Sequence, residues 1–197
     1  MLSRPPRFAA LLLLLGAAGC ATPIAPVEVT RFHLGAPVVR GSVTVEPQPG
    51  TDSGSLEYRA YIAGVERELS RIGYRIGQDR SDFVAVVGYT RGIRPAGAGR
   101  RSPISIGVGG GTGGGGVGLG LGVGFGIGGG KSGDVVTTQL SVQIKQRGSG
   151  EVVWEGRAQT EARENAPAAQ PGLAADRLSA ALFKDFPGES GRTISVK

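Results

Sequence analysis

The stretch "DVVTTQLSVQIKQRGSGEVVWEGRAQTEAR", residues 134–163, contains two alternating segments on either side of a turn. In both segments apolar side chains alternate with polar ones, a period of two that is typical of a strand with one face in the core and one in water. The intervening "RGSGE", residues 147–151, has the glycine and serine of a tight turn. The two segments therefore predict an antiparallel β-hairpin.

Two amphipathic segments predict helices. The first covers residues 55–72 and is followed by Gly73, where a C-cap glycine is usual. The second, of about fifteen residues, begins after Pro171 and ends at Pro187-Gly188. Their apolar residues recur at spacings of three and four, which puts them on one face of each helix. These residues are Tyr58, Tyr61, Ile62, Val65, Leu69 and Ile72 in the first helix and Leu178, Leu182 and Phe186 in the second.

Four further segments predict strands, and the order of all the elements indicates a fold class. Segments rich in β-branched and aromatic residues predict strands at 27–34, 41–47, 74–76 and 83–90. The order strand, strand, helix, strand, strand, hairpin, helix favours an α+β fold: a single two-layer domain with a mainly antiparallel sheet and both helices on one face. Residues 164–170 are expected to form a loop and residues 189–197 a flexible tail.

The first residues, "MLSRPPRFAALLLLLGAAGC", predict export. The apolar run from Phe8 to Ala18 follows two arginines and is shorter than the roughly 20 residues of a membrane-spanning helix, so residues 1–19 are expected to be a signal peptide. The sequence before Cys20 resembles the bacterial lipobox, in which the cysteine is lipidated on its sulfur and acylated on its new amine. Ala17 stands three positions before the cysteine, where leucine is usual in the lipobox. A soluble periplasmic protein cut at an A-x-A-like site is the alternative.

Cys20 is the only cysteine of the chain, which excludes an intramolecular disulfide. Several acyl chains are enough for stable anchoring, so the mature protein is expected to stay on a membrane. Ala21 is not the aspartate that marks inner-membrane retention in many lipoproteins, which favours the outer membrane and a periplasm-facing domain. Residues 20–27 are then the lipidated N-terminus and tether, and residues 28–188 the domain.

Five short motifs carry a family resemblance: "VEVTRFH" (27–33), "LSRIGY" (69–74), "SDFVAVVGY" (81–89), "GEVVWEGRAQTEAR" (150–163) and "FKDFPG" (183–188). In this order, with a glycine-rich insert, the chain resembles the bacterial lipoproteins catalogued as domain of unknown function 4136. The resemblance implies a lipid-anchored envelope protein without an assigned chemistry, so no functional residues are carried over. The order of motifs is also similar, more distantly, to lipoprotein components of secretion and assembly machines.

The sequence has few side chains that could act in catalysis. His33 is the only histidine, and its place on the first strand predicts a structural or surface role. Asp79 and Asp82 fit a turn and the start of a strand. No His or Cys pair has the spacing of metal ligands. The sequence therefore predicts no enzyme, no cofactor and no metal site.

"GFGIGGGKSGD", residues 124–134, looks like a phosphate-binding loop, but the motif requires glycine where Phe125 stands. Such a loop is followed by a helix, whereas a strand is expected here. A G-x-G-x-x-G match at Gly124, Gly126 and Gly129 is nearly guaranteed by composition, because 18 of the 34 residues from 97 to 130 are glycine. We expect neither nucleotide nor nucleic acid as a partner.

The glycine-rich insert, residues 95–131, alternates strictly between glycine and apolar residues from Val117 to Ile127. It is interpreted as a flexible insert, as a β-hairpin edge for self-association or a partner, or as a membrane contact, since eleven residues match a spanning strand. Basic residues near it could meet anionic headgroups, and spanning would require an oligomer. The candidate contact residues are Arg91, Arg94, Arg100, Arg101, Val117, Leu119, Leu121, Val123, Phe125, Ile127 and Lys131.

These observations predict a lipid-anchored cell-envelope protein with a non-enzymatic structural or interaction role. Removing residues 1–19 lowers the formal net charge from +6 to +4, a mild excess. The alternative is an oligomeric membrane-inserting or assembly component that uses the glycine-rich hairpin. The expected partners are the membrane, through the lipid, and a second copy or another envelope protein.

Overall fold

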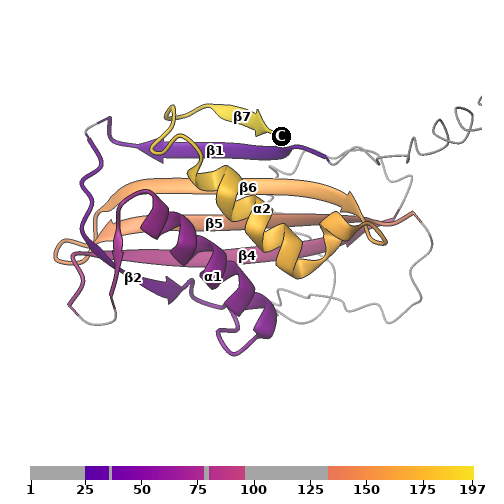
Figure 1. The fold of residues 1–197 in the computed structure, drawn as a ribbon, viewed down its shortest axis with the longest axis horizontal. Helices are drawn as coiled ribbons and strands as arrows, with labels where there is room; N and C mark the ends of the chain where they lie inside the picture. The colour runs from indigo at the N-terminus through magenta and orange to yellow at the C-terminus, as the bar shows by residue number, and fades with distance from the viewer. Residues whose placement is uncertain (1–24, 36, 78–79, 96–132) are drawn as a thin grey trace, which may run out of the picture.

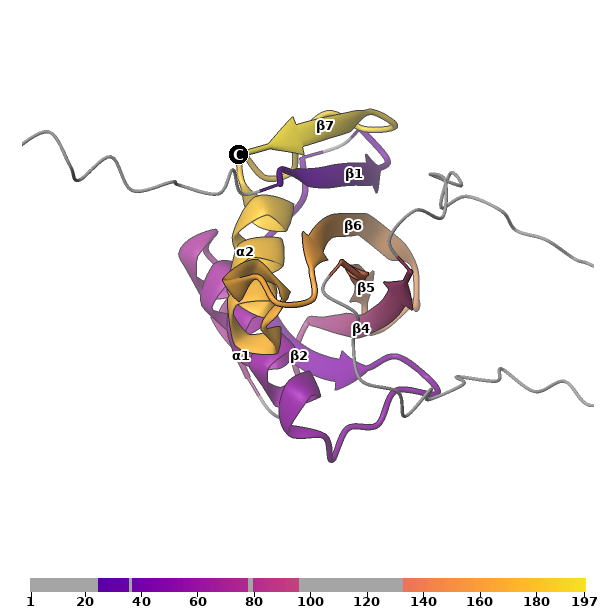
Figure 2. The ribbon, with the colours of Figure 1, turned by 90° about the vertical axis from the view of Figure 1, so that its right-hand side faces the viewer.

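The computed structural model of the 197-residue chain describes residues 25–35, 37–77, 80–95 and 133–197. They form one seven-stranded sheet in the order β3-β2-β4-β5-β6-β1-β7, with both helices on one face (Figures 1 and 2). The α+β prediction is confirmed. The elements are β1 (Val27–His33), β2 (Ser42–Pro47), α1 (Leu56–Arg71), β3 (Arg75–Ile76), β4 (Phe83–Arg94), β5 (Val135–Gln146), β6 (Val152–Arg163), η1 (Pro167–Ala169), α2 (Pro171–Phe183) and β7 (Thr193–Val196).

The hairpin of β5 and β6 lies at the centre of the sheet and is antiparallel, as predicted. Its alternation places Leu140, Val142 and Ile144 in the core, fully buried beneath the helices. The polar side chains between them lie on the opposite face and are only partly exposed. The hydrophobic pattern therefore sets which face of this hairpin the helices cover.

Helix α1 begins at a serine cap. The Ser55 Oγ accepts hydrogen bonds from the backbone N–H groups of Glu57 at 3.2 Å and Tyr58 at 3.4 Å, which satisfies two donors at the helix start. Beyond the other end of the helix, Gly73 has a φ of +99°, a left-handed conformation that favours glycine. In the middle of α1, a Cβ on Gly64 would lie 2.7 Å from the Ser179 Oγ of α2. The small residue thus allows the two helices to pack closely.

Strand β2 is parallel to both β3 and β4, and every other strand pair is antiparallel. Consecutive strands β1 and β2 are not neighbours, because β6, β5 and β4 stand between them in the sheet. The described connecting residues, 34–35 and 37–41, therefore cross one end of the sheet (Figure 1).

Three expectations about element bounds need correction. Residues 189–197 are not a flexible tail, because β7 pairs with β1 and covers part of an edge that would otherwise expose unpaired backbone groups. Strand β4 does not end at Thr90 but continues to Arg94, since its pairing with β5 extends to Val135. Helix α2 has 13 residues, and a short 3-10 turn stands in the expected loop before it.

Candidate functional site

The two ends of the sheet carry different groups. Strand β1 is antiparallel to β6, β6 to β5 and β5 to β4, so the start of β1 and the end of β4 lie at the same end of the sheet. In register, Arg94 stands opposite Val135, which stands opposite Arg163. We call this the tether end, because Val27 connects it to the N-terminal segment. The opposite end, with the turn between β5 and β6, is the groove end.

Two of the sequence-predicted contact residues lie at the tether end. Arg91 donates from Nη2 to the carbonyl oxygen of Ala169 at 2.8 Å, and its Nη1 lies 3.6 Å from the Glu57 Oε1. Arg94 pairs with Glu161 at 3.2 Å on the opposite face of the sheet. The two arginines are therefore not gathered into one basic patch, and each is bound by the domain itself.

The other predicted contact residues lie outside the described part of the chain. They are Arg100, Arg101, Val117, Leu119, Leu121, Val123, Phe125, Ile127 and Lys131, together with the lipidation residue Cys20. The described strands fix only where this segment leaves and returns, which is between Arg94 and Val135 at the tether end.

Tyrosines pack beside Arg91. The rings of Tyr61 and Tyr89 stack with centroids 4.6 Å apart, and Tyr58 stacks on Tyr89 at 6.4 Å. The hydroxyls of Tyr58 and Tyr61 are buried without a hydrogen-bond partner among the described residues. Burial raises the pKa of Tyr58 to about 12, and burial together with the Glu57 carboxylate raises the pKa of Tyr61 further. These phenols are therefore neutral across the physiological range.

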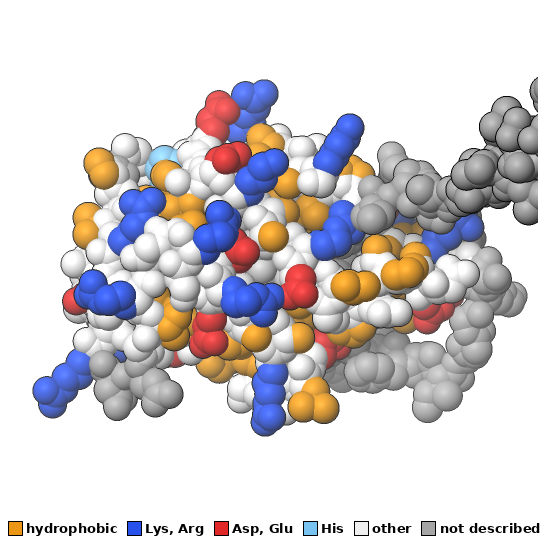
Figure 3. All heavy atoms as spheres, in the orientation of Figure 1, with side chains coloured by type: hydrophobic (Ala, Val, Ile, Leu, Met, Phe, Trp, Pro, Cys, Tyr) orange, Lys and Arg blue, Asp and Glu red, His pale blue; other side chains and the backbone are white. Residues whose placement is uncertain are grey.

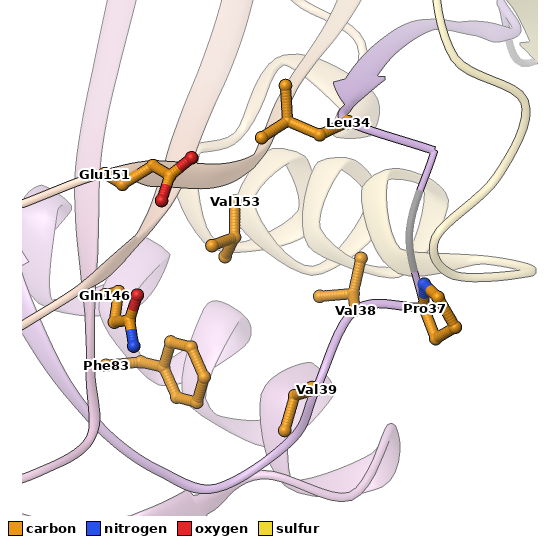
Figure 4. Close-up of a pocket in the computed structure, with 8 residues that line it drawn as sticks. All are labelled: Leu34, Pro37, Val38, Val39, Phe83, Gln146, Glu151 and Val153. Atoms are coloured by element: carbon orange, nitrogen blue, oxygen red, sulfur yellow. The ribbon is translucent and has the colours of Figure 1, made fainter. Parts of the chain in front are cut away.

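The groove end has an apolar pocket of about 220 Å³ (Figure 4). The crossing segment contributes Val38 and Val39 to one side, while β4 contributes Phe83. Exposed Leu34 stands at the rim, and the Glu151 carboxylate supplies a charge. The complete lining is Leu34, Pro37, Val38, Val39, Phe83, Gln146, Glu151 and Val153. The sequence does not predict this pocket, because its three chain segments meet only in the folded sheet.

Asp82 fixes the start of β2 to the start of β4 beside this pocket. Its Oδ2 accepts hydrogen bonds from the Ser42 N–H at 2.9 Å and the Ser42 Oγ at 2.7 Å, and its own N–H donates to the Ser42 Oγ at 2.9 Å. The two bonds to the carboxylate hold the pKa of Asp82 below its ordinary value. Asp82 thus serves the start of a strand, as the sequence indicated. Asp79 lies outside the described residues.

His33 is bound to the backbone on both sides of its ring. Its Nε2 lies 3.1 Å from the Gly188 carbonyl oxygen, and the Gly35 N–H donates to its Nδ1 at 3.2 Å. These contacts tie the end of β1 to the loop before β7, a structural use of the ring. Over residues 25–35, 37–77, 80–95 and 133–197, no three acidic, His or Cys side chains gather as metal ligands would.

Residues 42–188 match the family model of domain of unknown function 4136. The chain belongs to this family. The resemblance noted in the sequence is thereby confirmed. The match begins at β2, so β1 and β7 lie outside the DUF4136 match although they complete the same sheet. An uncharacterised protein of Zymomonas mobilis is 37% identical over 87% of this chain and 80% of its own length.

Among solved structures, this DUF4136 chain is similar to a PelC dodecamer from Paraburkholderia phytofirmans, with a TM-score of 0.39 and 10% identity over 79% of this chain and 93% of that one. A minor lipoprotein from Acinetobacter baumannii gives a TM-score of 0.39 and 12% identity over 82% and 99% of the two chains. A PDZ domain protein from Parabacteroides distasonis gives a TM-score of 0.49 and 12% identity over 87% of this chain and 39% of that one. Neither helix of the described residues has the length and apolar character needed to cross a membrane.

Proposed function

We propose that this chain is a lipid-anchored protein of the bacterial cell envelope, held at the outer membrane and facing the periplasm, with a non-enzymatic interaction role. The observation that carries the proposal is the short distance in sequence between Cys20 and the sheet. Val27, seven residues after Cys20, is already buried in β1 and paired with Val196. Only six residues of the sequence thus separate Cys20 from the first strand of the domain.

Replacing the lipidated cysteine tests the anchor. Cys20→Ser removes the sulfur that accepts the lipid, so we expect the protein to move from the membrane fraction to the soluble periplasmic fraction. Thr22→Ser, two residues further on, is the matched control and should fractionate as the original chain does. Membrane association that survives Cys20→Ser would contradict the anchor.

The choice between membranes rests on Ala21. Because aspartate after the lipidated cysteine marks inner-membrane retention in many lipoproteins, Ala21→Asp is expected to move the protein from the outer to the inner membrane. Density separation of the two membranes checks this. An unchanged distribution in a host known to sort by this residue would argue against the outer-membrane assignment.

We propose that the surface that binds the partner lies at the groove end of the sheet, opposite the tether end. Leu34 and Val39 are largely exposed there, and the apolar pocket opens between them and Phe83. A photo-crosslinking residue at Val39 in native envelopes should capture a defined partner. The control position is Arg59, which is exposed on α1. Identical products at both positions would show random collision and contradict a partner surface in the groove.

The second candidate function is an oligomeric membrane-inserting or assembly component that uses the glycine-rich segment. It is favoured by the connection of that segment to the tether end, where Arg94 and Val135 pair directly. Paired residues of antiparallel strands lie roughly 5 Å apart, so Asn-Gly in place of residues 96–132, which makes a five-residue loop with Pro95, Gly133 and Asp134, can join the strands without moving them. Loss of an oligomer or of vesicle binding in a folded variant would support this function. Unchanged association would contradict it.

A further inference from the structure

Three large apolar side chains are exposed at the tether end. Leu56, Ile93 and Leu173 have exposed fractions of 79%, 60% and 46%, and they come from the start of α1, the end of β4 and the start of α2. Figure 3 shows hydrophobic side chains on this right-hand side of the molecule, mixed with charged ones. Exposed apolar residues that gather at one end of a domain are typical of an interaction surface.

The contacts of Arg91 bring together the chain segments beside these three residues. Its guanidinium contacts Glu57, which follows Leu56, and the Ala169 carbonyl, four residues before Leu173. Ile93 lies two residues further along β4, so its side chain is on the same face of the strand as that of Arg91. Arg91 of β4 thus contacts α1 and the short turn η1, which directly precedes α2.

The tether brings this end of the domain close to the lipid. Seven residues from Cys20 to Val27 span at most about 25 Å when fully extended. Glu28 and Gln139 both stand opposite Gln159, so the start of β1 is seven residues of β5, or roughly 24 Å, from Gln146 at the groove end. For the groove end to face the bilayer, the tether would have to be almost fully extended. The tether end needs no such extension.

We infer that the tether end of the sheet rests on the bilayer, with Leu56, Ile93 and Leu173 in the interfacial region, and that the groove end points away from it. The inference rests on the lipid anchor proposed above. Apolar burial is the main source of this contact, because Arg91 and Arg94 are already paired with glutamates. Side chains at such an interface enter the headgroup region by roughly 5 to 10 Å.

Depth-dependent fluorescence quenching tests the orientation. The lipidated, full-length mature protein is reconstituted in phosphatidylethanolamine and phosphatidylglycerol vesicles that contain brominated acyl chains. Single cysteines are introduced by Leu56→Cys, Ile93→Cys or Leu173→Cys and labelled with an environment-sensitive dye, since the Cys20 sulfur is blocked by its lipid. Ser149→Cys, in the exposed turn at the groove end, is the control. All four positions are exposed, so the substitutions leave the core intact.

We expect quenching at the three apolar positions and none at residue 149. Equal quenching at residue 149 would mean that the domain lies flat or inverted, and it would overturn the inference. Quenching at fewer than two of the three apolar positions, while the protein remains on the vesicles, would overturn it too and leave the anchor intact. Failure of the anchor itself is separately visible, because mass spectrometry would then find Cys20 without acyl chains.

Discussion

The Arg31 guanidinium donates from Nε to the carbonyl oxygen of Leu182 at 2.9 Å, and so ties β1 to the last turn of α2. A second bond runs from its Nη2 to the Ala181 carbonyl oxygen, also at 2.9 Å. Both carbonyls belong to the helix end, where they have no partner within the helix. Arg31 is only 3% exposed, and its positive charge lies at the negative end of the helix dipole. A charged side chain is thus used inside the core as a helix cap.

Removal of this cap should destabilise the domain. Arg31→Met leaves two carbonyls without donors and is expected to lower the free energy of unfolding by about 2 to 4 kcal/mol. Arg31→Lys keeps the charge but not the planar pair of donors, so its loss should be smaller. Urea denaturation of the domain measures both. An unchanged midpoint in Arg31→Met would mean that the cap contributes nothing.

Gly156 of β6 is required by the packing of Trp154. A Cβ at this position would overlap the indole ring and lie 2.7 Å from the Leu182 Cδ1. Gly156→Ala is therefore expected to lower the free energy of unfolding by about 1 to 3 kcal/mol, as overpacking of a core does. Gly92→Ala on β4 is the matched control, because a Cβ there meets nothing within 4 Å. Equal effects of the two substitutions would contradict this reason.

The hydrogen bonds of Asp82 predict an acid dependence of stability. Because they lower the pKa of the folded carboxyl, their contribution is present above the ordinary pKa of about 4 and is lost as the pH falls through the folded value. Asp82→Asn should reduce the denaturation midpoint at neutral pH, and the difference from the original chain should shrink in acid. Ser42→Ala removes a donor to the carboxylate and should behave likewise. A difference that stays constant with pH would count against this role.

The buried tyrosines predict that the domain loses stability at alkaline pH. Burial raises the pKa of both Tyr58 and Tyr74 to about 12, so the folded state favours the neutral phenols. That contribution is full below the ordinary pKa of about 10 and is lost as the pH rises towards 12. Titration followed by tyrosinate absorbance should show these residues ionising only as the domain unfolds. Full tyrosinate absorbance near pH 10 in a folded protein would contradict the burial of these hydroxyls.

Part of the fold could be predicted because its signals are local. The alternation around Trp154 and the apolar stripe from Tyr58 to Leu69 depend on neighbours in sequence, and both elements are confirmed. Strand β7 was missed because its alternation of polar and apolar residues covers only four positions, which is too short to predict a strand. They form a strand because β1 offers an unpaired edge, and the Thr30 and Thr193 hydroxyls lie within hydrogen-bond distance at 2.7 Å.

The arginines of β4 show how a strand boundary changes the interpretation of a site. When the strand is expected to end at Thr90, Arg91 and Arg94 lie in an irregular connection before the glycine-rich insert and are free to gather. The strand continues, so a spacing of three places them on opposite faces of the sheet. Each then meets its own glutamate.

By itself, the sequence determined the α+β class, the central hairpin, the two helices and the family, because periodicity, caps and motif order act over short stretches of chain. Only the tertiary structure decided that Arg31 caps a helix some 150 residues away, that residues 34–41 help to form a pocket, and that the tether and the glycine-rich segment share one end of the sheet. These relationships depend on strand order. That order follows from how the whole chain buries its apolar faces, which no single segment specifies.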